Sequence, residues 1–212
     1  QRQMCIRDSL LPLRHPLPVA RQLASMARIA PGRMIFGVGS GGDDRHELEV
    51  CGVDPNRRGV RANESLTIIR RLLEGESVTF AGSEFDISDA RIKPKPRETI
   101  PILVGGRSDA ALERAAKHSE GWIGVWCSAK RYTEALGILT EKAEEFGRNQ
   151  VDWSHGYQPW IGVDKEDPKK ARAAVEKGME DFYKIPFSKF ERYTPFGTPS
   201  QVAEQLVPYI ES

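Results

Sequence analysis

Two glycine-dense segments are the residues of this sequence whose types and spacing could hold a ligand. The first, Gly37-Val-Gly-Ser-Gly-Gly42, overlaps the end of an apolar run at Met34–Val38 and precedes a polar helical stretch. The second, Gly105-Gly106, follows the apolar run Ile102–Val104 and precedes a helix expected over Asp109–His118. Glycine lets the backbone approach a ligand closely, and a helix N-terminus offers unpaired N–H groups and a positive dipole end. Both junctions therefore indicate a phosphate-bearing cofactor at one end of an α/β sheet or barrel.

The first glycine loop leaves two other interpretations open. Its G-x-G-x-x-G spacing also occurs in dinucleotide-binding folds, which need an acidic residue at the end of the next parallel strand, about 20 residues on. Glu64 lies near that distance, but the pattern places it in the middle of a long helix. A tight strand-to-helix turn without any ligand is the second alternative. Asp109 would likewise stabilise its own helix through the dipole whether or not a ligand binds.

Three further side chains are candidates for contact with a substrate. His15 precedes a proline near the end of the first apolar segment, His46 lies on a short polar helix beside the glycine loop, and Trp126 ends an apolar strand. Each also has an ordinary structural interpretation. His15 would be a turn residue, His46 a solvent-facing side chain and Trp126 a core side chain. The sequence identifies no catalytic acid or base.

Other polar residues have structural interpretations. Arg61 and Glu64 have the helical spacing of an ion pair, and His118 ends a helix where a cation would complement the dipole. Cys127 has no visible base partner, and no set of His, Cys, Asp and Glu residues has metal-binding spacing. We therefore expect neither a cysteine nucleophile nor a metal site.

Composition restricts the class of protein. The chain has 212 residues, 39% of them apolar, which suffices for the core of one domain or of a large part of one. With 31 basic and 30 acidic residues, its charge gives no reason to expect binding to nucleic acid or an anionic membrane. No apolar run is long enough to cross a bilayer, and the start lacks the apolar core of a signal peptide. Three widely spaced cysteines form no disulfide framework, which fits a cytoplasmic setting.

The elements that must position the glycine loops alternate between strands and helices, which predicts parallel βα units. Strands are expected over 34–38, 102–104, 122–126 and 157–163, and helices over 17–27, 43–51, 58–73, 109–118, 130–146, 168–183 and 200–210. The period changes from helical to alternating at 77–92, which predicts a small antiparallel excursion. Residues 1–9 have no clear period, and we expect them to be a non-native or disordered leader.

Six motifs occur in an order that is hard to obtain by chance. They are Leu11-Pro-Leu-Arg-His-Pro16, Gly32-Arg-Met-Ile-Phe-Gly-Val-Gly39, Arg58-Gly-Val-Arg61 with Glu64, Lys93-Pro-Lys-Pro96, Pro101-Ile-Leu-Val-Gly-Gly106 and Gly121-Trp122. Together they resemble the luciferase-like monooxygenase superfamily, and within it the branch whose members use the deazaflavin coenzyme F420.

This resemblance implies an α/β fold, the (β/α)8 TIM barrel of bacterial-luciferase type, with the cofactor at the C-terminal ends of the strands. Residues 10–212 would form one partial barrel domain with an insertion around 77–97. Such a barrel would lack N-terminal strands and the last strand, and we expect a fragment of this kind to be poorly active.

The resemblance also implies the residues that hold the cofactor, which would be F420 or, alternatively, FMN. Gly39 and Ser40 would flank its ring system, while Gly105, Gly106 and Asp109 would meet the ribityl–phosphate part. Leu11 would lie at a third strand end in contact with the cofactor.

The implied activity is that of an oxidoreductase or monooxygenase acting on a small organic substrate, with a homodimer as one assembly to consider. In the sugar-phosphate dehydrogenase branch the catalytic histidine lies upstream of this segment, and its acidic partner would fall near Gly42, which is not acidic. We therefore do not expect that particular activity. The alternatives are a Rossmann-type NAD(P)-dependent dehydrogenase and a degenerate barrel that binds a cofactor without turnover.

Overall fold

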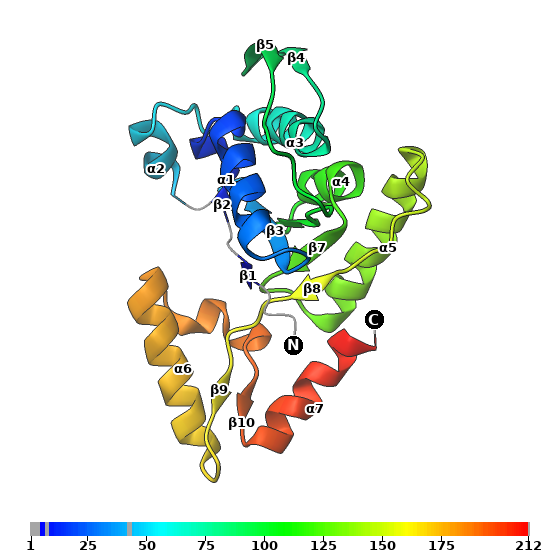
Figure 1. Cartoon of the computed structure of the whole chain (residues 1–212). Helices are drawn as coiled ribbons and strands as arrows, with labels where there is room; N and C mark the ends of the chain where they lie inside the picture. The colour runs from blue at the N-terminus through cyan, green and yellow to red at the C-terminus, as the bar shows by residue number, and fades with distance from the viewer. Residues whose placement is uncertain (1–4, 7–8, 42–43, 212) are drawn as a thin grey trace. The chain divides into compact units, whose positions relative to one another are not determined.

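The computed structural model describes residues 5–6, 9–41 and 44–211, and the chain divides into two compact units. Unit 1 consists of residues 1–122 and 142–155, and unit 2 of residues 123–141 and 156–212. Figure 1 labels the helices and strands of both units. Gly42 and most of the expected leader lie outside the described residues.

Unit 1 contains a sheet whose strands follow chain order. They are β1 (Cys5–Ile6), β2 (Ser9–Leu10), β3 (Met34–Gly39), β6 (Ile102–Gly105) and the start of β7 (Gly121–Gly124). Strands β1 and β2 pair in parallel with successive parts of β3, β3 pairs in parallel with β6, and β7 follows β6. Most of β3 is buried, as expected for a parallel strand that is covered on both faces.

This strand order excludes the dinucleotide-binding alternative. Doubly wound folds reverse the order of their strands at the point where the dinucleotide binds. The described strands from β1 to β7 instead lie in chain order without a reversal. The Rossmann interpretation of the first glycine loop is therefore wrong, and the order is that of consecutive strands in a (β/α)8 barrel. The sheet of the described residues is open, so it represents part of such a barrel.

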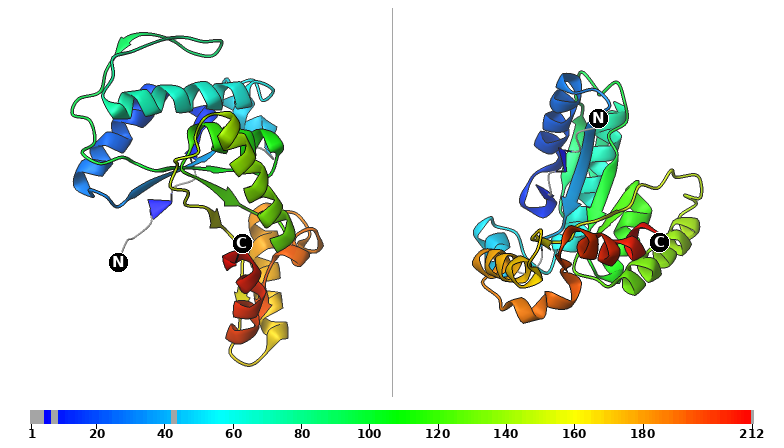
Figure 2. Two further views of the ribbon diagram at one scale, coloured as in Figure 1. Left: turned by 90° about the vertical axis from the view of Figure 1, so that its right-hand side faces the viewer. Right: turned by 90° about the horizontal axis from the view of Figure 1, so that it is seen from below.

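Three long helices cover the sheet of unit 1. They are α1 (Pro16–Ile29), α3 (Arg58–Glu74) and α4 (Asp109–His118). Helix α1 packs on α3 and β3, while α4 packs on α3 and β6, and Figure 2 shows α1 and α3 next to each other from two directions. Two shorter helical segments, η1 (Leu11–Leu13) and α2 (Arg45–Val50), follow the ends of β2 and β3 along the chain.

The antiparallel excursion is confirmed as a hairpin of β4 (Val78–Ala81) and β5 (Asp86–Ala90). It follows α3, which ends at Gly75 in the left-handed conformation (φ 89°) that favours glycine. The hairpin lies beside α3 in Figures 1 and 2. Its turn is held by Glu64, whose carboxylate accepts hydrogen bonds from the backbone N–H groups of residues 83–85 and from the Ser83 hydroxyl, at 2.8–3.1 Å.

Unit 2 contains the end of β7, which pairs in parallel with β8 (Gly156–Tyr157), and most of α5 (Ala129–Glu145). Strands β9 (Gly162–Val163) and β10 (Phe196–Gly197) form a separate parallel pair. The single strand expected over 157–163 is therefore wrong, because its two ends pair with different partners.

Unit 2 has an apolar cluster of Val175 and Met179 on α6 (Pro168–Tyr183), Phe187 at the start of η2 (Phe187–Lys189), and Phe190 directly after it. The segment continues through η3 (Glu191–Tyr193) to α7 (Pro199–Ile210), which packs on β9 and β10. Helix α7 begins with a reciprocal capping box, in which Thr198 and Gln201 each bond the other's backbone N–H.

Among the described residues, no helix is both long and apolar enough to cross a bilayer.

Candidate functional site

Three neighbouring strands of unit 1 end at the same level. Leu10 of β2 lies opposite Gly39 of β3, and Val38 of β3 lies opposite Val104 of β6. Continuing that parallel register by one residue places Gly39 beside Gly105. An ideal Cβ on Gly105 would lie 3.7 Å from the carbonyl oxygen of Val38, so the two strand ends are immediate neighbours.

The two glycines of the second segment, Gly105 and Gly106, differ in whether the fold requires glycine at their positions. Gly106 has φ +137°, which L side chains rarely adopt, and an ideal Cβ there would lie 2.7 Å from the Cβ of Ala111. The fold therefore requires glycine at position 106. Gly105 has no such constraint, because its Cβ would make only an ordinary contact at 3.7 Å. The missing side chain at Gly105 thus leaves room at the strand end for a group from outside the chain.

The start of α4 lies directly after these glycines. Ser108 is the N-cap, and its hydroxyl accepts a hydrogen bond from the N–H of Ala111 at 3.3 Å. Asp109 is the exposed first residue of the helix, where its charge is favourable for the dipole. The indole Nε1 of the buried Trp122 donates to the carbonyl of Gly106 at 2.7 Å and connects the start of β7 to this loop.

The remaining residues that the sequence predicts for cofactor binding lie around the same strand ends. Ser40 is half-buried, and its hydroxyl lies 3.5 Å from the carbonyl oxygen of Gly41. Gly41 has φ +70°, so the first glycine loop also uses a conformation that favours glycine. Leu11 begins η1 directly after β2, and its side chain is fully buried. The structure therefore does not favour a ligand contact at Leu11.

His15 lies near the end of β2 but has structural partners. Its Nδ1 accepts a hydrogen bond from the N–H of Leu17 at 3.2 Å, which caps α1. Its ring meets that of Phe85 edge-on, with 5.4 Å between the centroids. Partial burial and the nearby Arg61 guanidinium lower the pKa of His15, which favours the neutral imidazole that this cap requires.

The other two candidates for substrate contact lie in different surroundings. His46 is an exposed residue in the first turn of α2, where its backbone N–H donates to the capping carboxylate of Asp44 at 2.9 Å. Trp126 belongs to unit 2, and its ring lies 5.0 Å from that of Tyr183 and 4.8 Å from that of Phe190. Its backbone has φ +46°, which is unusual for a bulky residue. The structure thus favours the core-packing alternative for Trp126.

Two structural expectations from the sequence are wrong. Arg61 pairs with Glu84 (3.5 Å) rather than with Glu64, which caps the hairpin turn instead. His118 does not serve as a helix-ending cation, because burial and four nearby cations lower its pKa to about 4 and leave it neutral. These cations are Lys117, Arg114, Arg148 and Arg70.

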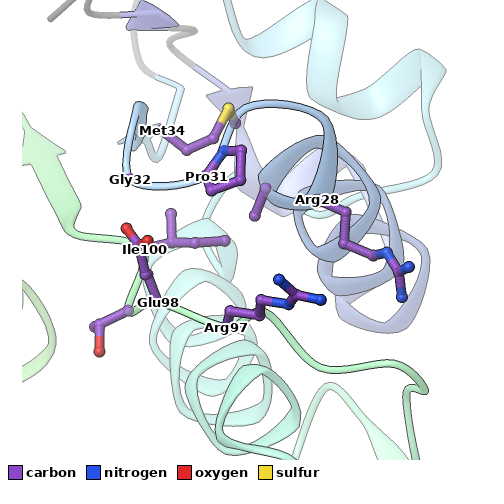
Figure 3. A pocket seen from close by; sticks show the side chains of 9 residues that line it. Arg28, Pro31, Gly32, Met34, Arg97, Glu98 and Ile100 are labelled. Atoms are coloured by element: carbon purple, nitrogen blue, oxygen red, sulfur yellow. The ribbon is translucent and has the colours of Figure 1, made fainter.

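A cavity of about 150 Å³ lies at the opposite end of the same strands (Figure 3). Met34, which begins β3, and Ile100, which precedes β6, contribute to its wall together with Arg28, Arg97 and Glu98. In barrels of this type the C-terminal strand ends carry the chemistry and the N-terminal ends contribute to stability. The cavity is therefore separate from the site at the glycine loops. In the part of the chain that the structure describes, no three His, Cys, Asp or Glu side chains are arranged to hold a metal ion.

The sequence profile of the luciferase-like monooxygenases matches residues 9–195. The chain therefore belongs to the luciferase-like monooxygenase family, which confirms the resemblance seen in its ordered motifs.

Two relatives illustrate this membership. An uncharacterized protein of Mycobacterium tuberculosis is 41% identical over 181 residues, which cover 84% of this chain and 61% of that protein. An F420-dependent glucose-6-phosphate dehydrogenase of Microbacterium testaceum is 34% identical over 142 residues, covering 65% of this chain and 42% of the enzyme. The chain thus spans about three fifths or less of the length of these relatives.

Solved structures confirm the barrel fold. An F420-dependent secondary alcohol dehydrogenase, in complex with an F420–acetone adduct, matches with a TM-score of 0.83 at 20% identity, covering 98% of this chain and 69% of that one. The oxygenating constituent of 3,6-diketocamphane monooxygenase from Pseudomonas putida, in complex with FMN, matches with a TM-score of 0.70 at 18% identity, covering 96% and 68%. At these identities the likeness concerns the fold alone.

Sequence reasoning does not predict the role of Trp122 at these strand ends, since Trp122 enters it only through the Gly121-Trp122 motif. Its bond to the Gly106 carbonyl arises because neighbouring parallel strands bring the two together. Glu64 is neither the acidic residue of a dinucleotide site nor the ion-pair partner of Arg61, because it anchors the hairpin turn.

Proposed function

We propose that this chain is the cofactor-binding part of an oxidoreductase that uses F420 or, alternatively, FMN and acts on a small organic molecule. The observation that carries this proposal is the alignment of three strand ends at Leu10, Gly39 and Gly105. The fold does not require glycine at position 105, and the absence of a side chain there leaves space beside the strand end. F420 is the first choice because the ordered motifs resemble those of the deazaflavin branch, and one relative is named as F420-dependent.

The residues present fit such a cofactor. The backbone at Gly39, Ser40 and Gly105 would approach its ring and side chain, and the N-terminus of α4 would receive its phosphate part at Gly106 and Asp109. When bound, F420 supplies hydride chemistry and FMN supplies oxygen activation. The part of the chain described here would position the ring and exclude water from one side of it.

Separate titrations with F420, FMN and NADPH test this proposal, with binding followed by cofactor or tryptophan fluorescence. We expect saturable binding of F420 or FMN and no saturable binding of NADPH. Saturable binding of NADPH alone would overturn the proposal.

A degenerate barrel that binds its cofactor without turnover is the second candidate. It is favoured by the surroundings of the two histidines considered as substrate contacts, since the imidazole of His15 caps α1 and His46 is exposed on α2. Cofactor binding without turnover by the full-length parent protein would favour this candidate. Four expectations from the sequence stay predictions. They are a small organic substrate, a homodimer, a cytoplasmic location and a non-native or disordered leader at residues 1–9.

A further inference from the structure

Arg61 of α3 connects two segments that are distant from it in the sequence. Its Nε donates to the carbonyl oxygen of Pro12 at 2.7 Å, and Pro12 is buried in η1 directly after β2. Its Nη1 lies 3.5 Å from Oε2 of Glu84 in the hairpin turn. One guanidinium group therefore joins the exit of β2 to the hairpin.

The hairpin side of this connection is well packed. The Cζ atom of Arg61 lies 4.5 Å from the centroid of the Phe85 ring, and the ring of His15 meets Phe85 edge-on. Phe85 is only 5% exposed. The planar guanidinium can stack on the ring and donate in its own plane at the same time, which a lysine ammonium cannot do.

The hydrogen bond to the carbonyl of Pro12 is the part of this connection that would stabilise the exit of β2. Buried backbone acceptors without a partner are costly, and the guanidinium provides a charge-assisted hydrogen bond to this one. Pro12 lies two residues after Leu10, which pairs with Gly39 at the candidate cofactor site. Movement of η1 would therefore displace one of the three strand ends that form the site.

We propose that Arg61 is a positioning residue that holds the exit of β2 in place for cofactor binding and links it to the hairpin. This inference rests on the proposed function, since it assigns Arg61 a role at the same site. Arg57 provides a matched control, because it also pairs with Glu84 but its side chain is 48% exposed. In the part of the chain that the structure describes, its side-chain hydrogen bonds and ion pairs involve neither Pro12 nor Phe85.

Two measurements on R61M, R61K and R57M test the role of Arg61 in the whole chain. The first is amide hydrogen exchange at Leu11, Leu13 and Arg14, which needs no cofactor. We expect exchange in R61M to be about tenfold faster, because the bond that closes η1 onto α3 is lost. In R57M we expect exchange within about twofold of the unsubstituted chain, since exposed ion pairs contribute little.

The second measurement is the dissociation constant for F420 and for FMN. R61M should raise it about tenfold, R61K should restore part of the affinity through the bond to Pro12, and R57M should change it less than about twofold. Thermal unfolding of all three variants shows whether a loss of affinity merely follows a loss of stability.

The outcomes separate this inference from the proposed function. Equal exchange at residues 11–14 in R61M and R57M would overturn the role of Arg61, as would a loss of affinity that is the same in both variants. If the unsubstituted chain binds neither F420 nor FMN, the proposed function fails and so does a role for Arg61 in cofactor binding. The exchange measurement would then still decide whether Arg61 holds η1.

Discussion

The indole nitrogen of Trp122 lies 2.7 Å from the carbonyl oxygen of Gly106. This bond joins the start of β7 to the loop after β6, so it fixes the glycine loop that leads into α4. Because Trp122 is only 2% exposed, water cannot easily replace the indole as the donor.

Replacing this tryptophan tests the importance of the bond. W122F keeps an aromatic ring but removes the donor and some volume, so we expect a loss of about 1–3 kcal/mol in the free energy of unfolding. Urea unfolding followed by circular dichroism measures it. W153F is the control, since Trp153 is half-buried and stacks on His155, and it should cost less than about 1 kcal/mol. An equal loss in both variants would argue against a special role for the Trp122 bond.

His118 should make stability depend on pH. Its folded pKa of about 4 lies below its ordinary value of 6.5, so the unfolded state binds the proton more readily between these values. The contribution of His118 is therefore present above pH 6.5 and is lost as the pH falls toward 4. Between pH 7 and pH 5, we expect the unsubstituted chain to lose about 2 kcal/mol more than H118Q, which lacks this group. Urea unfolding at both pH values measures the difference, and parallel losses would refute the assignment.

Glu64 should control the order of the hairpin. Burial alone would raise the pKa of Glu64, but hydrogen bonds from Ser83, Glu84 and Phe85 lower it overall, so the carboxylate is charged when it holds the turn. E64A should destabilise the hairpin by about 1–3 kcal/mol.

Hydrogen exchange at residues 78–90 would report this loosening. The matched control is E74A on the same helix, because Glu74 is exposed and, among the described residues, only its backbone carbonyl accepts a side-chain hydrogen bond, from Lys95. Unchanged exchange in E64A would mean that other contacts hold the turn.

The sequence predicted well those elements whose signals are local. The expected bounds of 168–183 match α6, because Asp167 caps the helix with bonds to the N–H groups of Lys169 and Lys170 and Pro168 occupies its first turn. The strand at Met34–Val38 was confirmed with one more residue, Gly39, because its apolar run is buried on both faces. The neighbouring glycine strand ends followed from the general rule that parallel strands end at one face.

Features set by residues distant in sequence could not be predicted. The low pKa of His118 comes first from burial and then from nearby cations, among them Arg148 and Arg70, which only the tertiary structure brings near. Glu64 meets donors 19 to 21 residues downstream, which outweigh the local partner at helical spacing. The division of the segment 157–163 into β8 and β9 also depends on distant residues, because β8 pairs with β7 and β9 pairs with β10.

Gly106 should be required for stability whether or not a cofactor binds. G106A places a Cβ at φ +137° and 2.7 Å from that of Ala111, so we expect a loss of about 1–3 kcal/mol in the free energy of unfolding. Thermal and urea unfolding measure this loss in the absence of cofactor. A variant as stable as the unsubstituted chain would show that the loop relaxes easily.

The most direct test of the cofactor site is the affinity of G105A for F420 and FMN, measured by fluorescence titration together with its unfolding free energy. The added methyl group makes only an ordinary contact at 3.7 Å within the chain, but it would occupy room at the strand end beside Gly39. We expect a stability within about 1 kcal/mol of the unsubstituted chain and a dissociation constant raised at least about tenfold. Unchanged affinity for the cofactor that the unsubstituted chain binds would contradict a cofactor site at these strand ends.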